Sequence, residues 1–103
     1  MKLAALTTAP AYDIIINATS VGSVAGETPV KDEAFFRDRT VAMDVIPVPA
    51  QTTFLKHAKA RGAKQVCGYR MLIHQALFQM ELFTGRKAPF AVMEKTVLDA
   101  VGN

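Results

Sequence analysis

The sequence has 103 residues, half of them hydrophobic, and a formal net charge of +3 at pH 7. This length suits one small domain with one core. The basic residues are scattered, which argues against a nucleic-acid-binding protein or a membrane-surface protein. No apolar run is long enough to span a bilayer, and the N-terminus lacks a signal-peptide core. The single cysteine, Cys67, excludes an internal disulfide and favours a reducing compartment, so we expect a cytoplasmic protein.

The first strand signal follows a short lead-in, residues 1–12, that carries no glycine-rich phosphate loop. The β-branched run Ile14–Ile16 predicts a strand buried on both faces, as in a parallel sheet. It ends in small polar residues, including Asn17, Thr19 and Ser20. In open α/β sheets, ligands bind at the carboxyl ends of the strands. This stretch therefore predicts either a strand that brings these side chains to a binding crevice or a strand followed by a polar turn without a ligand.

The next segment predicts a short helix and a second strand. Pro29 suits a first helical position, and Val30 and Phe35 suit the inner face of the helix. Residues 41–46 then form a second candidate for a buried strand. Pro47 ends that strand because proline cannot donate to a ladder hydrogen bond.

Two helices and a third strand follow. Thr52 or Thr53 is placed to cap a helix that closes at Gly62. Residues 65–67 predict a short strand. Residues 70–83 predict a long helix that is apolar around nearly its whole circumference and is terminated by Gly85. Such a helix is expected to be buried on most sides, by its own fold or by a partner.

A last helix, opened by Pro89, carries one apolar face made of Phe90, Met93, Val97 and Val101. Strand, helix, strand, helix, strand, helix, helix is the order typical of parallel βαβ units.

Three motifs in the same order along the chain are similar to a known family. They are DIIINATSVG from Asp13, DVIPVPAQTTFL from Asp44 and GYRMLIHQALFQMELFTG from Gly68. Together they resemble the C-terminal half of shikimate dehydrogenases, including the quinate/shikimate branch, over residues 12–93. The resemblance implies an α/β fold: half of a Rossmann-like doubly wound domain, with about three parallel strands, flanking helices and two C-terminal helices. The chain is then a single partial domain over residues 1–103.

The resemblance implies an NADP-dependent oxidoreductase that interconverts 3-dehydroshikimate and shikimate, a step of aromatic amino acid biosynthesis. In that family an N-terminal domain carries the catalytic Lys and Asp, and a G-x-G-x-x-G-type turn holds the cofactor. These 103 residues contain neither feature, so the chain looks like a fragment that is inactive alone. The alternative is a non-catalytic half-Rossmann module that binds a nucleotide weakly or serves only for chain association.

The resemblance also implies site residues. The cofactor would contact three places in the chain: Asn17, Thr19 and Ser20 after the first strand, Val45 after the second, and Gly68 and Met71 in the long helix. Gln75 would bind the substrate, whereas its plainer interpretation is a contact with solvent or a backbone carbonyl. Pro47 stands where the family usually has a substrate-contacting Tyr, so the choice between shikimate and quinate stays open.

The remaining polar candidates have structural interpretations. Asp44 is expected to cap the loop that follows it rather than to act as a general base. His57 is expected on the surface, and His74 is expected to be exposed or structural. Cys67 is expected to be an inert thiol, and it forms no metal-ligand pattern with the histidines.

We also expect a homodimer. A strand at Ile14–Ile16 without a partner on its outer side is an unprotected edge. The long apolar helix is a second surface for association. Edge pairing is slightly favoured over helix packing.

Overall fold

The computed structural model describes residues 12–101, so most of the expected lead-in and the last two residues lie outside it. Strands β1 (Ile14–Asn17), β2 (Val41–Asp44) and β3 (Lys64–Val66) form one parallel sheet in the order β1-β2-β3. A 3₁₀ turn, η2 (Glu33–Phe35), and three helices, α1 (Thr53–Ala60), α2 (Gly68–Thr84) and α3 (Phe90–Val101), complete the fold. The expected α/β class and the parallel strands are confirmed.

Local signals place the helix boundaries well. The Thr52 hydroxyl accepts a hydrogen bond from the Leu55 amide at 3.3 Å and is the N-cap of α1. Gly62 follows the end of α1 with φ +81°, and Gly85 ends α2 with φ +68°, both in the left-handed region that glycine adopts without strain. The two helix ends at Gly62 and Gly85 are confirmed, and Thr52 is the cap of the two candidates, Thr52 and Thr53. These signals are readable in the sequence because each acts through neighbouring residues.

Two strand boundaries differ from expectation. β2 ends at Asp44 rather than residue 46, because the Asp44 carboxylate accepts a hydrogen bond from the Ile46 amide at 3.0 Å and turns the chain. β3 ends at Val66, because Cys67 is already the N-cap of α2. The helix expected after Pro29 is only the single turn η2.

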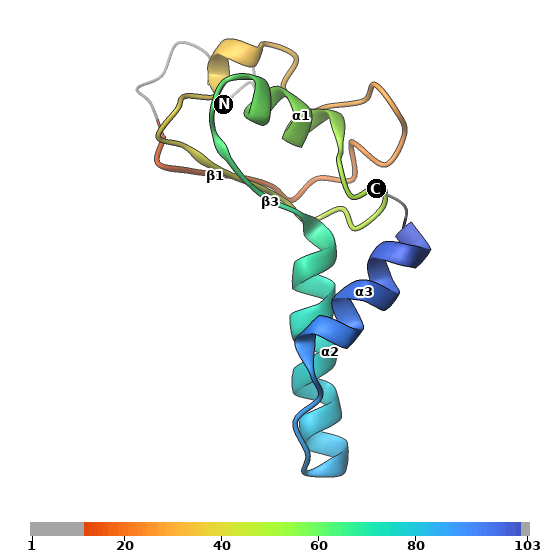
Figure 1. The fold of residues 1–103 in the computed structure, drawn as a ribbon. Helices are drawn as coiled ribbons and strands as arrows, with labels where there is room; N and C mark the ends of the chain where they lie inside the picture. The colour runs from red at the N-terminus through yellow and green to blue at the C-terminus, as the bar shows by residue number, and fades with distance from the viewer. Residues whose placement is uncertain (1–11, 102–103) are drawn as a thin grey trace.

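The core lies between one face of the sheet and α1 with η2 (Figure 1). Ala42 of β2 faces it, and Phe36, Phe54 and Leu55 are its largest fully buried side chains. The Phe36 and Phe54 rings meet edge to face with centroids 5.0 Å apart. On β1, Ile15 pairs in register with Ala42 and packs against this core.

The expectation that Ile14–Ile16 is buried on both faces is wrong. Ile14 is 65% exposed and Ile16 is 54% exposed, while Ile15 between them is half-buried. The cause is topological: β1 borders the sheet, and α1 and η2 lie on the face opposite to Ile14 and Ile16. Alternate side chains of a strand point to opposite faces, so only Ile15 reaches the core.

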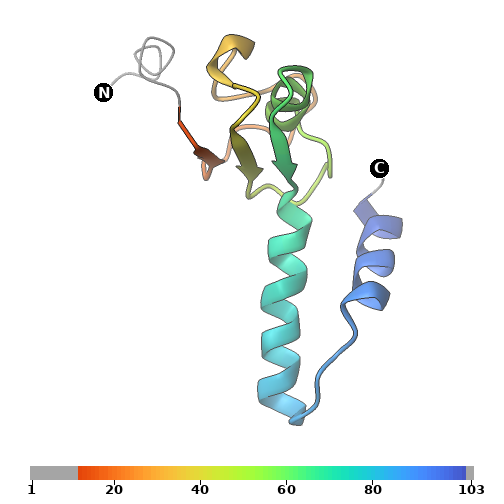
Figure 2. The same ribbon diagram turned by 60° about the vertical axis from the view of Figure 1, so that its left-hand side comes forward.

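Helix α2 extends away from the sheet, and α3 folds back beside it (Figure 2). The 17 residues of α2 span about 25 Å, and the chain measures 49 × 24 × 24 Å. The chain's own fold does not bury α2 on most sides: of its residues, only Gly68 and Ile73 are fully buried. Burial by a partner, the other alternative, stays a prediction. The exposed large apolar side chains of this helix are Met71, Leu72, Phe78, Met80, Leu82 and Phe83.

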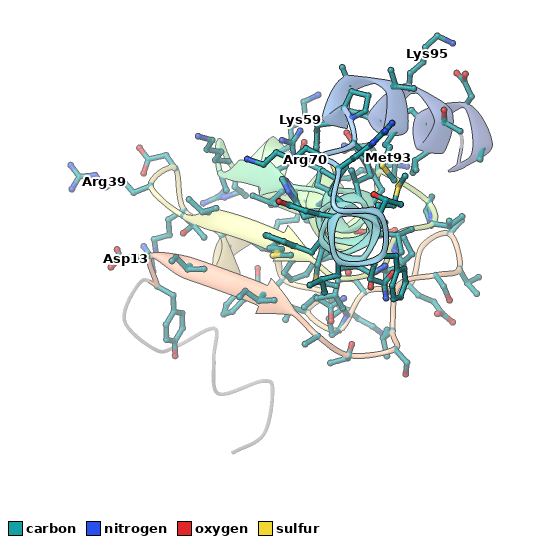
Figure 3. The ribbon with its side chains drawn as sticks, turned by 90° about the horizontal axis from the view of Figure 1, so that it is seen from below. Asp13, Arg39, Lys59, Arg70, Met93 and Lys95 are labelled. Atoms are coloured by element: carbon teal, nitrogen blue, oxygen red, sulfur yellow. The ribbon has the colours of Figure 1, made fainter. Side chains whose placement is uncertain are left out.

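Contacts between α2 and α3 involve polar and aromatic groups near the sheet. The Arg70 guanidinium lies 3.1 Å from the Glu94 carboxylate and 5.2 Å from the Phe90 ring centroid. Elsewhere the basic side chains Arg39, Lys59 and Lys95 project from separate elements, seen along α2 in Figure 3. This spread agrees with the scattered charge of the sequence.

Candidate functional site

The candidate site lies at the carboxyl edge of the sheet, where three segments meet. They are the loop after β1 (residues 18–22), the turn after β2 and the N-terminus of α2. Asn17 and Asp44 are paired in register as the last residues of β1 and β2. The Val45 amide donates to the Asn17 carbonyl oxygen at 3.0 Å, which holds the first two segments together.

Gly68 brings the N-terminus of α2 against the same edge. A Cβ at this position would meet the carbonyl oxygen of Ile46 and lie 2.6 Å from the carbonyl oxygen of Asp44. Only a residue without a Cβ allows this approach of helix to strand end. The sequence singled out Gly68 for an approach to a nicotinamide; the structure adds a packing requirement within the chain itself.

Asn17 is buried and uses its whole amide inside the protein. Its Nδ2 donates to the Val21 carbonyl oxygen at 3.0 Å and to the Asp44 carboxylate at 3.2 Å. Its Oδ1 accepts from the amide and the hydroxyl of Thr19, at 3.1 and 2.7 Å. Asn17 therefore shapes the loop from within, while Thr19 and Ser20 are exposed on it.

Asp44 is fully buried and accepts from three elements of structure. Besides the Ile46 amide, it accepts from Asn17 and, at 2.7 Å, from the hydroxyl of Thr52. The expected loop-capping role is confirmed. The partners Asn17 and Thr52 were missed. The sequence carried a signal for Asn17 alone: polar residues that end adjacent parallel strands lie side by side when the register aligns the strand ends, as it does here.

The predicted residues of α2 share one side of the helix. Gly68, Met71 and Gln75 are spaced by three and four residues, so they form one stripe that starts at the carboxyl edge. Met71 is 45% exposed, and Gln75 is exposed as well. The structure thus brings Asn17, Val45 and Gly68 together and places Met71 and Gln75 successively farther along α2.

The histidines do not build a catalytic site. His57 is half-buried rather than on the surface, because α1 packs against η2 there, and its Nε2 lies 3.6 Å from the Glu33 carboxylate. His74 is exposed, and its ring lies 5.0 Å from that of Phe90. Over residues 12–101, no group of three His, Cys, Asp or Glu side chains is placed to hold a metal ion.

Burial raises the pKa of the Cys67 thiol, and the nearby Arg70 charge only partly opposes this. A raised pKa lowers the thiolate fraction at neutral pH, and the thiolate is the reactive form. We therefore expect iodoacetamide to alkylate Cys67 more slowly in the folded protein than in the same chain in guanidinium chloride at the same pH, because the folded protein has the smaller thiolate fraction. Equal rates in both states, followed by mass spectrometry, would contradict an inert thiol.

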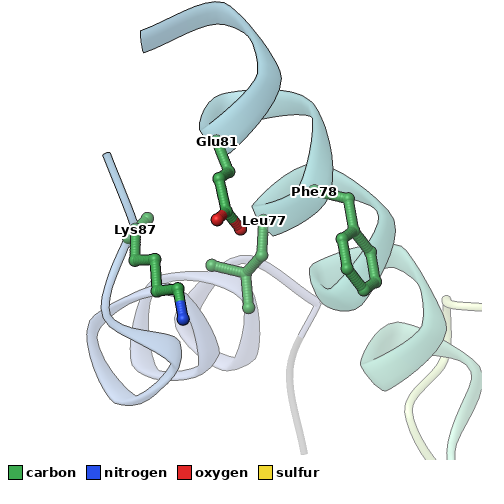
Figure 4. Close-up of a pocket in the computed structure, with 5 residues that line it drawn as sticks. Leu77, Phe78, Glu81 and Lys87 are labelled. Atoms are coloured by element: carbon green, nitrogen blue, oxygen red, sulfur yellow. The ribbon is translucent and has the colours of Figure 1, made fainter. Parts of the chain in front are cut away.

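A separate groove lies between the second half of α2 and the loop before α3 (Figure 4). It is lined by Leu77, Phe78, Glu81, Lys87 and Ala88. It holds none of the residues predicted for the site. In the described part of the chain, no helix is both long enough and apolar enough to cross a membrane.

Comparisons with known proteins agree with the motif resemblance. The family described as "Shikimate 5'-dehydrogenase C-terminal domain" matches residues 68–98. The shikimate dehydrogenase (NADP(+)) of Nitrosopumilus maritimus is 39% identical over 87 residues, which are 84% of this chain and 32% of that protein. The enzyme of Thermococcus kodakarensis is 39% identical over 89 residues, 86% of this chain and again 32% of the relative. The chain thus spans about a third of the length of these relatives.

Solved structures show the same relation. The shikimate 5-dehydrogenase of Thermus thermophilus, in complex with NADP(H) and shikimate, superposes with a TM-score of 0.83 at 31% identity, over 92% of this chain and 36% of that one. The ligand-free 5-ketofructose reductase of Gluconobacter also superposes with a TM-score of 0.83. It is 39% identical, over 89% of this chain and 34% of that one. In sequence and in fold, this chain resembles the C-terminal part of the Rossmann-like region of shikimate dehydrogenases.

Proposed function

We propose that this chain supplies the nicotinamide side of the cofactor site in an NADP-dependent oxidoreductase of the shikimate dehydrogenase type. The observation that carries the proposal is the carboxyl edge of the sheet. There the loop after β1, the turn after β2 and the N-terminus of α2 converge, at the edge where open α/β sheets bind ligands. The reaction is hydride transfer between NADP(H) and the substrate carbon that carries the hydroxyl or carbonyl group. For a shikimate dehydrogenase the two substrates are shikimate and 3-dehydroshikimate.

The residues take different parts in this proposal. The exposed side chains of Thr19 and Ser20 lie along the cofactor, while buried Asn17 holds their loop. Val45 and Met71 pack beside the nicotinamide, and the backbone of Gly68 approaches it. Gln75, one turn farther along α2 than Met71, donates a hydrogen bond to a substrate hydroxyl or carboxylate. The catalytic acid and base belong to no described residue.

The identity of the substrate is a narrower question. Pro47 replaces the tyrosine that the family usually places near the substrate, so one phenolic hydroxyl is lost. The Gluconobacter protein, a 5-ketofructose reductase, is as similar to this chain as the named shikimate dehydrogenases are. A second candidate function is therefore reduction of a polyhydroxylated ketone other than 3-dehydroshikimate.

We further propose a cytoplasmic homodimer. The lone Cys67 suits a reducing compartment, and the exposed apolar residues of β1 and α2 suit association between copies. We propose that residues 1–103 are a single partial domain, and that the dimer interface uses one of these two surfaces.

A nucleotide titration tests the cofactor site. Adding NADP⁺ or nicotinamide mononucleotide to the ¹⁵N-labelled chain should shift the amide signals of Thr19, Ser20, Val45 and Gly68, with millimolar affinity. Affinity is expected to be weak because the pyrophosphate of a dinucleotide normally binds at a glycine-rich turn and helix N-terminus, and the sequence contains no such turn.

Adenosine 2′,5′-bisphosphate, which lacks the nicotinamide, is the matched control and should shift none of these signals. Micromolar affinity for NADP⁺ would contradict the proposed weak, one-sided site. Absence of any shift with nicotinamide mononucleotide would favour the chain-association module instead.

A further inference from the structure

The buried carboxylate of Asp44 joins three elements at the candidate site. It accepts from Asn17 at the end of β1, from Ile46 in its own turn and from Thr52 at the N-cap of α1. Asp44 and Thr52 have no exposed surface, and Asn17 is 3% exposed. The proposed reaction uses none of this carboxylate's chemistry, so its position needs another explanation.

The carboxylate determines which way the Asn17 amide faces. An ionised carboxylate only accepts hydrogen bonds, so the NH₂ group of Asn17 must point at Asp44. The amide oxygen then points the other way, at the amide and hydroxyl of Thr19. With its proton donated to Asn17, the Thr19 hydroxyl accepts from the Val21 amide at 3.2 Å. The hydrogen-bond directions from Asp44 to Val21 thus depend on one another.

Gly22 closes the loop against the same group. It has φ +134°, and a Cβ there would lie 3.1 Å from the Ile46 side chain and 3.8 Å from the Asp44 carboxylate. The loop of residues 18–22 therefore begins and ends at Asp44. Asp44 is in turn held by α1. The Thr52 hydroxyl donates to Asp44 and also accepts from the amide of Leu55 in α1.

We propose that Asp44 is a positioning residue for cofactor binding: by orienting Asn17 it sets the loop that presents Thr19 and Ser20. The cofactor part of this inference rests on the proposed function, whereas the loop part does not. The carboxylate takes no proton in the reaction and touches no ligand.

Asp44→Leu is the central test, because leucine branches at the same carbon as aspartate and offers no acceptor oxygen. The Asn17 amide, the Thr52 hydroxyl and the Ile46 N–H then all lose their buried acceptor, and nothing orients the Asn17 amide. Amide hydrogen exchange at Thr19 and Val21 should quicken about tenfold or more relative to Ala42 in β2. Nicotinamide mononucleotide should bind correspondingly more weakly.

Two variants separate positioning from simple destabilisation. Thr40→Val removes an equally buried hydroxyl, which donates to the Tyr12 carbonyl oxygen away from the loop. It should quicken exchange at Ala42 as much as at Thr19 and Val21. The double variant Asn17→Asp with Asp44→Asn restores a donor–acceptor pair with the directions reversed, and it should recover protection at Thr19. Protection of the Val21 amide should recover less, because the Val21 carbonyl oxygen loses its hydrogen bond from the Asn17 amide.

Loop exchange in Asp44→Leu that matches the wild type would overturn the proposal, as would a uniform increase like that of Thr40→Val. If Asp44→Leu does not fold, Asn17→Asp alone decides, since it leaves the bonds of Asp44 to Ile46 and Thr52 in place. A loop that stays protected in Asn17→Asp would also overturn the proposal. If the wild-type chain shows no nucleotide shift, the proposed function fails while the exchange pattern still tests the loop.

Discussion

Replacing Gly68 by alanine is expected to lower the free energy of unfolding by about 3 kcal/mol or more. The new methyl group would overlap the carbonyl oxygens of Asp44, at the end of β2, and Ile46, in the turn after it; both are backbone atoms and cannot rotate away as a side chain can. Relief requires α2 to move off the sheet. The direction of the change in stability is informative. Alanine in a helix is otherwise favoured over glycine by up to about 1 kcal/mol, so a loss of stability points to the overlap.

Urea denaturation monitored by circular dichroism measures this effect, and Gly85→Ala is its matched control. Gly85 also borders α2, but a Cβ there meets nothing within 4 Å, and only its φ of +68° opposes alanine. That substitution should cost about 1 kcal/mol. If Gly68→Ala proved as stable as the wild type, the close packing of α2 on the strand ends would not be required for the fold.

The second large effect is expected on self-association. Light scattering at micromolar concentration should give the mass of a dimer, and Phe78→Lys with Leu82→Lys should give a monomer that stays folded. These side chains are 68% and 82% exposed and lie one turn apart on α2, so they contribute little to the core of the single chain. Burying them between copies removes more apolar surface from water than pairing two four-residue β1 edges.

Gln79→Lys controls for added positive charge on α2, since Gln79 is polar and exposed, and it should leave the dimer intact. Ile16→Lys tests pairing through β1. Ile15 is unsuitable for that purpose because it faces the core, whereas Ile16 is 54% exposed. A monomeric Ile16→Lys protein beside a dimeric α2 variant would show that the strand edge is the interface, and a wild-type monomer would refute association altogether.

The sequence by itself determined the features that depend on near neighbours in the chain. Thr52 as N-cap, Gly62 and Gly85 as helix ends and the three strand segments were all predictable, because capping, left-handed backbone and β-branched runs act within a few residues. The colinear motifs also indicated the parallel half-Rossmann architecture, since they carry the spacing of its elements.

Only the tertiary structure decided which surfaces are buried. The run Ile14–Ile16 and the apolar circumference of α2 both predicted burial, yet burial requires an element on the other side. Here α1 and η2 cover one face of the sheet, and α3 covers one side of α2. Burial of an apolar side chain is favourable, but whether the side chain is buried depends on how distant elements of the chain pack around it.

The hydrogen-bond network at the candidate site depends on long-range packing for a related physical reason. Asn17 and Asp44 are 27 residues apart, and their hydrogen bond exists because β1 and β2 pair in the register that aligns their last residues. The need for glycine at position 68 likewise arises from strand-end carbonyls more than twenty residues away. The types of these residues were visible in the sequence, but their partners are set by sheet register and helix docking, which long-range packing determines.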